Sequence, residues 1–404
     1  MKILITSRLY PSSACPSRGT FVHNQARFLA QHCDVEVISP TPFFLPVPGL
    51  GKWSAYGRVP RLEVRDGLSI RYPRYLSLPG RRLFGQAWRF YLGAVRRALA
   101  HRPELIHAHL AYPDGLAAAH LARALGVPLV ISVHGHDVRE IPAANPRWGA
   151  LVAAALRQAD RVVHSSTDVR QRLLALGCAA GQLEYVPQGV DCQLFRPGPV
   201  RGGAPGPWRL LYVGRLDQRK GIGVLLESLA LLRRRRTDVV LTLIGGSPVS
   251  GTAAAFREQA VRAGVQECVE FVDALPWEQI APRMAAADVI VLPSFYDSFG
   301  IVLIEAMACG RPVVATRCGG PADIVTDQTG LLVRPGDAAD LARGLDQVLT
   351  DYGRYDPAAI RRHVEARYDY RQIALRLIGM YRQLLGGSAA SAPSPPHAQG
   401  KDRP

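Results

Sequence analysis

The chain has 404 residues, more than one hydrophobic core usually supports, which predicts two domains. No apolar run approaches 18 residues, so we expect no membrane span. The net charge of +16 indicates an anionic partner, whether a nucleic acid, a membrane surface or a phosphorylated substrate, and a high-GC genome that favours Arg and Ala contributes to it. The seven cysteines are scattered without a CxxC pair, which indicates neither a disulfide framework nor a zinc site and fits a reducing cytosol.

The chain begins as a Rossmann-like domain. A short apolar strand over residues 2–6 precedes a loop that contains Gly19, a helix over residues 21–32 and a second strand over residues 35–39. The absence of GxGxxG argues against a dinucleotide-dependent oxidoreductase. Because the first residues carry one basic side chain and only a short apolar run, we expect no signal peptide and a cytoplasmic protein.

The stretch from Lys52 to Arg102 differs in composition from the rest. It contains twelve Lys or Arg against two acids, Glu63 and Asp66, with eight aromatic side chains among them. Basic and aromatic residues together suit an anionic membrane surface, and they would also suit RNA. A solvated helix docked on its own domain is the third interpretation.

Histidines follow two of the next strands. His107 and His109 lie at a strand end within residues 105–115, and His134 and His136 lie at the end of another strand within residues 129–138. Pairs at i, i+2 without an HExxH helix or a cysteine partner argue against a metal site.

The Pro/Gly-rich stretch 196–207 predicts a linker. We therefore expect an N-terminal domain over residues 1–195 and a C-terminal domain over 208–368. A helix over 369–386 crosses back to the first domain, and the low-complexity tail 387–404 is expected to be disordered.

The C-terminal domain opens with a buried strand, residues 209–213, and a cationic loop. Gly214, Arg215 and Lys220 follow the strand, and two cations five residues apart beyond a strand end can hold both phosphates of a diphosphate. Solvent-exposed loop charge is the alternative. Later strands over residues 239–244 and 269–272 end in loops that contain Gly245, Asp273 and Leu275.

Residues 289–320 predict strand, loop, helix and strand. We expect strands over 289–292 and 313–316, and a helix over 300–309 that Ser298 caps and that begins near Phe299 and Gly300. The N–H groups at that helix start suit phosphate.

Glu305 is the only charge on this apolar helix, so it should have a partner. It lies about 9 Å along the helix from its start, within reach of the ribose of a nucleotide whose diphosphate sits at the helix start. Asp297 would then face a sugar at the other end of the diphosphate. A buried Glu paired with an Arg for structure is the alternative.

Four motifs resemble those of glycosyltransferase family 4. The family pattern of Glu, seven residues, Glu and Ala-Met-Ala-x-Gly is matched by Asp297, seven residues, Glu305 and the run Ala306-Met307-Ala308-Cys309-Gly310, with Asp297 one methylene shorter than Glu. Residues 134–138 resemble His-Gly-x-Asp-Val. Residues 188–197 resemble Asn-Gly-Val-Asp-x-x-x-Phe-x-Pro with Gln188 in place of Asn, and residues 214–221 resemble Gly-Arg-x-x-x-x-Lys-Gly.

The resemblance implies an α/β protein of GT-B fold, with two Rossmann-like domains facing a donor cleft. It implies a retaining glycosyltransferase that moves a sugar from a nucleotide-sugar, UDP-sugar first and GDP-mannose second, to a lipid-linked or polysaccharide acceptor. The protein would act without a cofactor or metal, in the cytoplasm or on the inner face of the plasma membrane. No nucleic acid is expected as a partner.

The resemblance also assigns site residues. The catalytic set comprises Arg215, Lys220, Asp297 and His134. Donor binding falls to Gly19, Gly214, Gly245, Asp273, Leu275, Ser298, Phe299, Gly300 and Glu305. Two other classes of function remain: a GT-B sugar epimerase or phosphorylase, and a non-catalytic nucleotide-binding or RNA-binding protein.

Overall fold

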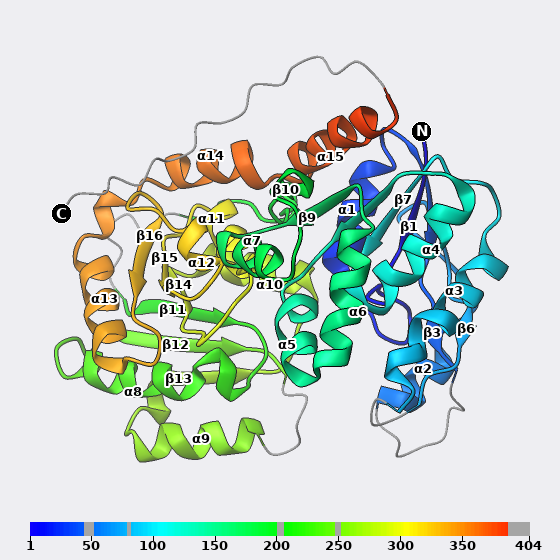
Figure 1. Ribbon diagram of the computed structural model, residues 1–404. Helices are drawn as coiled ribbons and strands as arrows, with labels where there is room; N and C mark the ends of the chain where they lie inside the picture. Colours follow the sequence, from blue (N-terminus) through cyan, green and yellow to red (C-terminus); the bar gives the residue numbers. More distant parts are fainter. Residues whose placement is uncertain (44–51, 79–81, 200–205, 247–251, 387–404) are drawn as a thin grey trace.

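The computed structural model describes residues 1–43, 52–78, 82–199, 206–246 and 252–386. Two α/β units lie side by side, and in each of them helices cover both faces of a largely parallel sheet (Figure 1). We call them the N-terminal and C-terminal domains. The tail 387–404 and residues 200–205 of the expected linker lie outside the described residues.

The sheet of the N-terminal domain has eight strands in the order β10-β9-β8-β7-β1-β2-β5-β4, and only the β4–β5 pair is antiparallel. The strands are β1 (Lys2–Thr6), β2 (Asp34–Ile38), β4 (Leu62–Arg65), β5 (Leu68–Arg71), β7 (Leu105–His109), β8 (Leu129–Ser132), β9 (Arg161–His164) and β10 (Leu183–Tyr185). A separate pair comprises β3 (Thr41–Pro42) and β6 (Arg74–Tyr75). The helices are α1 (Thr20–Leu29), α2 (Lys52–Arg58), α3 (Ala87–Ala98), α4 (Leu116–Leu125), α5 (His136–Ala144), α6 (Pro146–Arg157) and α7 (Thr167–Ala175).

The sheet of the C-terminal domain has six parallel strands in the order β13-β12-β11-β14-β15-β16. They are β11 (Trp208–Val213), β12 (Val239–Ile244), β13 (Val269–Val272), β14 (Val289–Leu292), β15 (Val313–Thr316) and β16 (Gly330–Val333). The helices are α8 (Ile222–Arg233), α9 (Thr252–Arg262), α10 (Trp277–Ala286), α11 (Ile301–Ala308), α12 (Pro321–Ile324), α13 (Ala338–Thr350) and α14 (Pro357–Tyr368).

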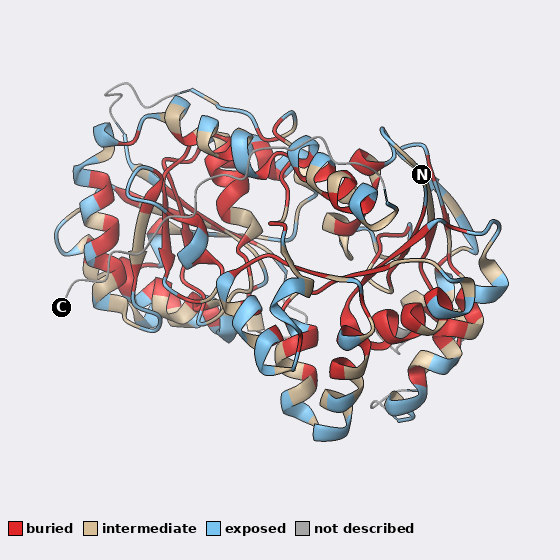
Figure 2. Ribbon diagram, turned by 45° about the horizontal axis from the view of Figure 1, so that its top comes forward, coloured by how far each residue is buried: buried red, intermediate tan, exposed pale blue. Residues whose placement is uncertain are grey.

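Buried apolar strands form the centre of both domains. The strands that run red in Figure 2 lie between helices whose outer faces are blue, as expected for parallel sheets covered on both faces. Five strands occupy the residues that their β-branched runs predict, namely 2–6, 239–244, 269–272, 289–292 and 313–316. Among the described helices, none combines the length and apolar character needed to cross a bilayer.

The last helix, α15 (Tyr370–Leu384), returns the chain to the N-terminal domain. Val190 pairs with Asp369 through backbone hydrogen bonds to the residues on either side, and the Tyr370 ring stacks on Phe28 of α1 at 5.4 Å between centroids. Helix α15 thereby contributes to the same hydrophobic core as α1. The two domains are connected at residues 190–208 and again at residues 368–370.

Each sheet has a point where the strand order reverses, and these points locate the site. In the N-terminal sheet the reversal lies between β1 and β7, and in the C-terminal sheet it lies between β11 and β14. Ligands of open α/β sheets bind outside the carboxyl ends of the strands at such points. The loops after β11 and β14 carry Lys220 and Asp297.

Candidate active site

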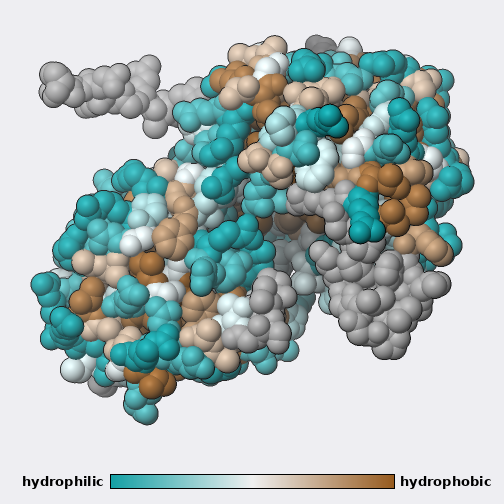
Figure 3. Space-filling view, turned by 60° about the horizontal axis from the view of Figure 1, so that its bottom comes forward, coloured by the Kyte–Doolittle hydropathy of each residue, from teal (hydrophilic) through white to brown (hydrophobic). Residues whose placement is uncertain are grey.

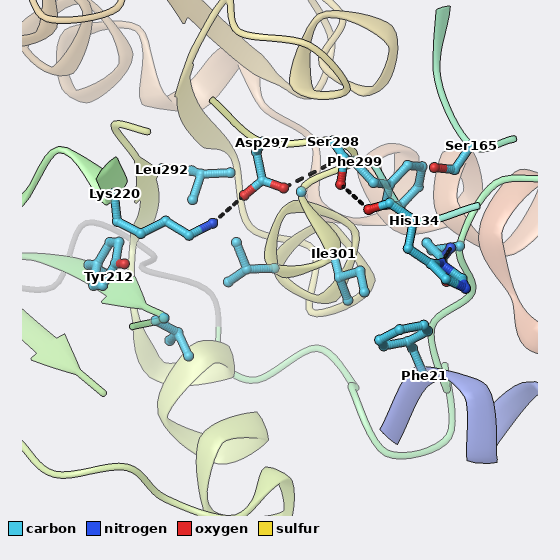
Figure 4. A pocket seen from close by; sticks show the side chains of 15 residues that line it. Phe21, His134, Ser165, Tyr212, Lys220, Leu292, Asp297, Ser298, Phe299 and Ile301 are labelled. Carbon is cyan, nitrogen blue, oxygen red and sulfur yellow. Dashed lines mark hydrogen bonds and ion pairs between the residues drawn. The ribbon is translucent and has the colours of Figure 1, made fainter. Parts of the chain in front are cut away.

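A cavity of about 270 Å³ lies between the two domains, at the carboxyl ends of their strands. Both domains line it, and Figure 4 shows the N-terminal side chains Phe21, Ser165 and His134 facing the C-terminal ones across the space. Seven residues predicted from the sequence border the cavity: His134, Gly214, Lys220, Asp297, Ser298, Phe299 and Gly300.

Lys220 is positioned by a short turn after β11. The Asp217 carboxylate accepts from the backbone N–H of Lys220. Gly221 follows in a left-handed conformation, and a Cβ there would lie 2.0 Å from the carbonyl oxygen of Pro293, so only glycine fits. The Lys220 ammonium then donates to Asp297 Oδ2 at 2.6 Å (Figure 4). The cation and the carboxylate predicted to be catalytic therefore meet, and each neutralises the other.

Arg215 does not border the cavity. Its side chain is 53% exposed and lies 3.2 Å from the Asp217 carboxylate. Its backbone carbonyl accepts from the Tyr212 hydroxyl, and Tyr212 is one of the residues lining the cavity. Arg215 is thus available at the edge of the site, and its side chain would have to turn in order to reach a ligand there.

Helix α11 points its N-terminus into the cavity. Gly300 precedes it in a left-handed conformation, with φ of 94°, and both Ile301 and Val302 of its first turn line the cavity. The first backbone N–H groups of a helix have no partner within the helix, so this end provides donors and a positive dipole for an anion.

The predicted cap at Ser298 is wrong. The helix starts at Ile301, two residues further on than the sequence indicates, so the Ser298 hydroxyl cannot reach the first free N–H groups. It donates instead to the backbone carbonyl of His134 at 3.1 Å and joins the two domains. A Cβ on Gly135 would lie 2.4 Å from the Ser298 Cβ, so only glycine permits this approach.

Glu305 lies in the middle of α11 and is buried, with 6% of its surface exposed. The alternative of a structural pairing with an Arg is not met in the described part of the chain, where no side chain or backbone group hydrogen-bonds or ion-pairs with the Glu305 carboxylate. Burial raises the pKa of Glu305 to about 8. An acid that remains buried at this cost is poised for a ligand that supplies hydrogen bonds.

The histidines form a hydrogen-bonded column. His107 bonds to the Tyr381 hydroxyl of α15 at 2.6 Å and to Ser132 Oγ at 2.7 Å, and its ring stacks on His109. His109 Nδ1 lies 3.1 Å from His134 Nε2. Within the described residues, no three His, Cys, Asp or Glu side chains gather as a metal ion would require.

Burial lowers the pKa of His107 to about 3 and that of His134 to about 4, and it lowers the pKa of His109 well below its usual value. The rings are therefore neutral at pH 7. Because Gln188 Nε2 donates to His134 Nδ1 at 3.4 Å, the proton of neutral His134 lies on Nε2 and is donated to His109 Nδ1.

Besides Arg215, five of the predicted residues lie away from the cavity or behind its wall. Gly19 precedes α1 in a left-handed turn, and a Cβ there would lie 2.3 Å from the carbonyl oxygen of Leu9. A Cβ on Gly245 would lie 1.7 Å from the carbonyl oxygen of Gly214, so this glycine lets the ends of β11 and β12 approach. Asp273 and Leu275 occupy the loop between β13 and α10, and Glu305 lies one turn behind the α11 N-terminus.

Contacts between the domains surround the cavity. Tyr296 of the C-terminal domain donates its hydroxyl to Asp168 at 2.7 Å, and the Arg139 guanidinium lies 3.8 Å from the centre of its ring. The backbone N–H of Thr167 donates to Asp323, and Arg219 pairs with Glu140 at 3.1 Å. The two domains are thus held closed over the site by side chains from both.

Two family models match the chain, one on each domain. "Glycosyltransferase Family 4" matches residues 19–194, and "Glycosyl transferases group 1" matches residues 207–351. The teichuronic acid biosynthesis glycosyltransferase TuaC of Bacillus subtilis is 31% identical over 85% of this chain and 88% of its own length. The chain belongs to glycosyltransferase family 4. D-inositol 3-phosphate glycosyltransferase 2 of Catenulispora acidiphila is 34% identical over 73% of this chain and 76% of that protein.

Solved structures agree with this family 4 assignment. Sucrose-phosphate synthase from Thermosynechococcus elongatus superposes with a TM-score of 0.78 at 26% identity, covering 96% of this chain and all of that one. Anabaena HepE in complex with UDP-glucose superposes at 0.71 with 20% identity, covering 95% of this chain and all of that one, a likeness of fold. The predicted GT-B fold is confirmed.

The family 4 protein is a glycosyltransferase that uses a nucleotide-sugar donor. The alternatives of an epimerase, a phosphorylase or a non-catalytic nucleotide-binding protein find no support among these relatives. The motifs were needed to distinguish these functions, because the basic and aromatic composition suits both RNA and a membrane surface as partners.

Sequence reasoning missed eight of the residues that line the cavity, and four of these carry aromatic or polar side chains. Phe21 packs its ring against His134 at 4.7 Å between centroids, and Ser165, Gln188 and Tyr212 border the same space. Ser165 and Gln188 follow β9 and β10. The rule that ligands bind at the carboxyl ends of parallel strands was therefore enough to indicate both.

Proposed function

We propose that this glycosyltransferase moves the sugar of a UDP-sugar, with GDP-mannose as the second choice of donor, onto a lipid-linked or polysaccharide acceptor with retention of anomeric configuration. One observation carries the proposal. A buried carboxylate without a partner in the described residues, Glu305, stands one turn behind a helix N-terminus that opens beside Lys220.

The donor is placed by matching its groups to these side chains. The diphosphate would sit on the N-terminus of α11 and against Lys220, where free N–H groups and the ammonium oppose its charge. The ribose hydroxyls would donate to Glu305. The sugar would then lie toward Asp297 and His134, which border the same cavity from opposite domains (Figure 4).

The residues bordering the cavity favour a front-face mechanism. The acceptor oxygen bonds to the anomeric carbon on the face from which the diphosphate leaves, so configuration is retained, and the leaving phosphate oxygen takes the acceptor proton. Asp297 is the only carboxylate among the described residues that line the cavity, and it is already paired with Lys220, so no unpaired carboxylate stands there to act as the base. Lys220, with Arg215 at the edge, would stabilise the charge on the leaving diphosphate.

The names of related proteins support the donor and acceptor classes. Anabaena HepE was solved with UDP-glucose, and TuaC is named for teichuronic acid biosynthesis. The stretch from residue 52 to 102 adds twelve cations and aromatic side chains that suit an anionic inner membrane surface. A peripheral enzyme in the cytoplasm that reaches a lipid-linked acceptor accounts for the similarity to TuaC and for the basic, aromatic-rich stretch.

The test begins with a thermal-shift screen of UDP-sugars and GDP-mannose. A UDP-sugar that raises the melting temperature is then offered with lipid-linked, oligosaccharide and inositol phosphate acceptors, and the anomeric configuration of the product is read by proton NMR. Transfer with retention to a lipid-linked or oligosaccharide acceptor is the expected result. Stabilisation only by GDP-mannose would overturn the UDP assignment, and an inverted product would overturn the front-face mechanism.

A further inference from the structure

A second hollow lies outside the donor cleft, on the N-terminal domain. It is a groove of about 430 Å³ formed by the end of β3, by β6 and by one face of α3. The backbone N–H of Phe43 donates to the carbonyl of Tyr75 at 2.7 Å and fixes one wall. The groove is lined by Phe43, Arg74, Tyr75, Leu76, Arg89, Phe90, Gly93 and Arg97.

The floor of the groove is a stripe along α3. Arg89, Gly93 and Arg97 recur at i, i+4 and i+8 and so share one face of the helix. Glycine inside a helix is less stable than alanine, and a Cβ at Gly93 would meet only Arg97 Nη1 at 3.5 Å, an ordinary contact. Packing therefore does not require glycine here. Its effect is to leave space between the two arginines.

The groove carries positive charge without a counter-charge. No carboxylate lines it, and among the described residues none forms an ion pair with Arg74, Arg89 or Arg97. Arg74 Nη1 is buried and has no hydrogen-bond partner there. Burial and the nearby Arg61 lower the pKa of Arg74, so this cation is held at a cost that an anion would relieve.

The rim of the groove is apolar. Of the eleven large apolar side chains that the described residues expose, six lie between residues 43 and 83 of the sequence, and two of these six, Phe43 at 56% and Leu76 at 43%, line the groove. Figure 3 shows brown side chains gathered among teal ones on the right-hand lobe, which is the N-terminal domain. Exposed apolar side chains concentrated in one region mark a binding surface more often than scattered ones do.

We propose that this groove binds the phosphate or diphosphate group of a lipid, with the adjoining hydrocarbon against Phe43, Leu76 and Phe90. Guanidinium groups pair with phosphate through two hydrogen bonds each, and Arg74, Arg89 and Arg97 all line the groove, whose volume of about 430 Å³ leaves room for the adjoining hydrocarbon as well. A nucleic acid would supply phosphates but leave the apolar wall without a partner. The inference rests on the proposed function in that the lipid is taken to be the anchor of the acceptor.

The probe is farnesyl diphosphate, a short isoprenoid with a diphosphate, titrated calorimetrically into the full chain. Inorganic diphosphate and farnesol report on the anionic and apolar parts separately. Because the donor cleft also attracts diphosphate, variants report on the groove. Gly93→Leu should fill it and weaken farnesyl diphosphate at least tenfold, whereas Gly93→Ala, which fits the helix, should not. Arg97→Glu should weaken it likewise, whereas its exposed neighbour Arg96→Glu, outside the groove, is the matched control.

Three results would overturn the proposal that the groove binds a lipid phosphate. They are equal losses for Arg96→Glu and Arg97→Glu, equal affinities for inorganic and farnesyl diphosphate, and displacement of farnesyl diphosphate by a single-stranded RNA homopolymer. Hydrolysis of the donor in the absence of acceptor is measured on the same variants and should stay at the wild-type level, because the groove lies outside the donor cleft. If the protein binds the lipid but turns over no donor, the proposed function is rejected and the lipid-binding groove stands. If the protein turns over the donor but Gly93→Leu still binds the lipid, the lipid-binding groove is rejected and the proposed function stands.

Discussion

The two sides of the donor cleft differ in charge and in how their side chains are held. On the C-terminal side, Lys220 and Asp297 are charged, partly exposed and paired at 2.6 Å. On the N-terminal side, His134 is neutral at pH 7 because burial lowers its pKa to about 4, and its ring is held by another neutral histidine. The C-terminal side can therefore oppose the charge of a diphosphate, and the N-terminal side can only offer hydrogen bonds.

This difference indicates that the two domains have different roles in binding the donor. The Lys220–Asp297 pair keeps each charge satisfied until a donor arrives, so no free buried charge has to be maintained there. Glu305 differs, because its carboxyl is buried without a partner in the described residues and burial raises its pKa to about 8, so that it is mostly protonated at pH 7. The C-terminal domain is prepared for a ligand at that carboxyl, whereas on the N-terminal side His109 already holds His134 through the 3.1 Å contact between their ring nitrogens.

The largest expected effect comes from removing the charged side. Lys220→Ala removes the ammonium that opposes the diphosphate, and Glu305→Ala removes the acceptor for the ribose. Each should lower donor turnover about a hundredfold, which corresponds to about 2.7 kcal/mol. Steady-state kinetics with the donor found by thermal shift checks this, and Arg262→Ala, an exposed cation on α9, is the control. Wild-type rates for both variants would show that Lys220 and Glu305 do not bind the donor.

The sequence predicted the parts of the site that depend on local pattern. Runs of β-branched residues placed β12 and β14 to the residue, and the motif spacing brought Lys220 and Asp297 into one site. It could not place the histidine column, because His107 meets Tyr381 across 274 residues of sequence and only the return of α15 creates that contact. Ser298 failed as a cap for a similar reason, since its partner lies in the other domain.

The second prediction weakens the neutral side. His109→Phe keeps a ring in the stack and removes the nitrogen 3.1 Å from His134 Nε2, so the His134 ring loses its orientation. One hydrogen bond contributes about 1 kcal/mol, so we expect kcat to fall about five- to tenfold with little change in donor KM. His109→Asn, whose amide can stand in for Nδ1, should recover most of the rate. Equal losses for the two variants would assign His109 a packing role only.

The third prediction uses pH to test Glu305. Ribose hydroxyls donate to the ionised carboxylate, so donor binding should lower its pKa and release protons near pH 7. If only the ionised form binds, affinity should fall about fivefold from pH 8 to pH 7, since a group with pKa of about 8 is half ionised at the first and about a tenth ionised at the second. Calorimetry in buffers of different ionisation heat measures the protons. Glu305→Gln should release none, and an unchanged release in that variant would place the titrating group elsewhere.

The smallest expected effect is that of removing metal. The chain has no Asp-x-Asp pair to hold a cation on the donor phosphates, and Lys220, Arg215 and the N-terminus of α11 offer positive charge at that place. Transfer should therefore proceed at an unchanged rate in excess EDTA, measured on protein dialysed against chelator. Activity lost in EDTA and restored by manganese would show that the C-terminal side does not carry enough charge alone. A metal ion would then have to supply the positive charge that the C-terminal side of the cleft lacks.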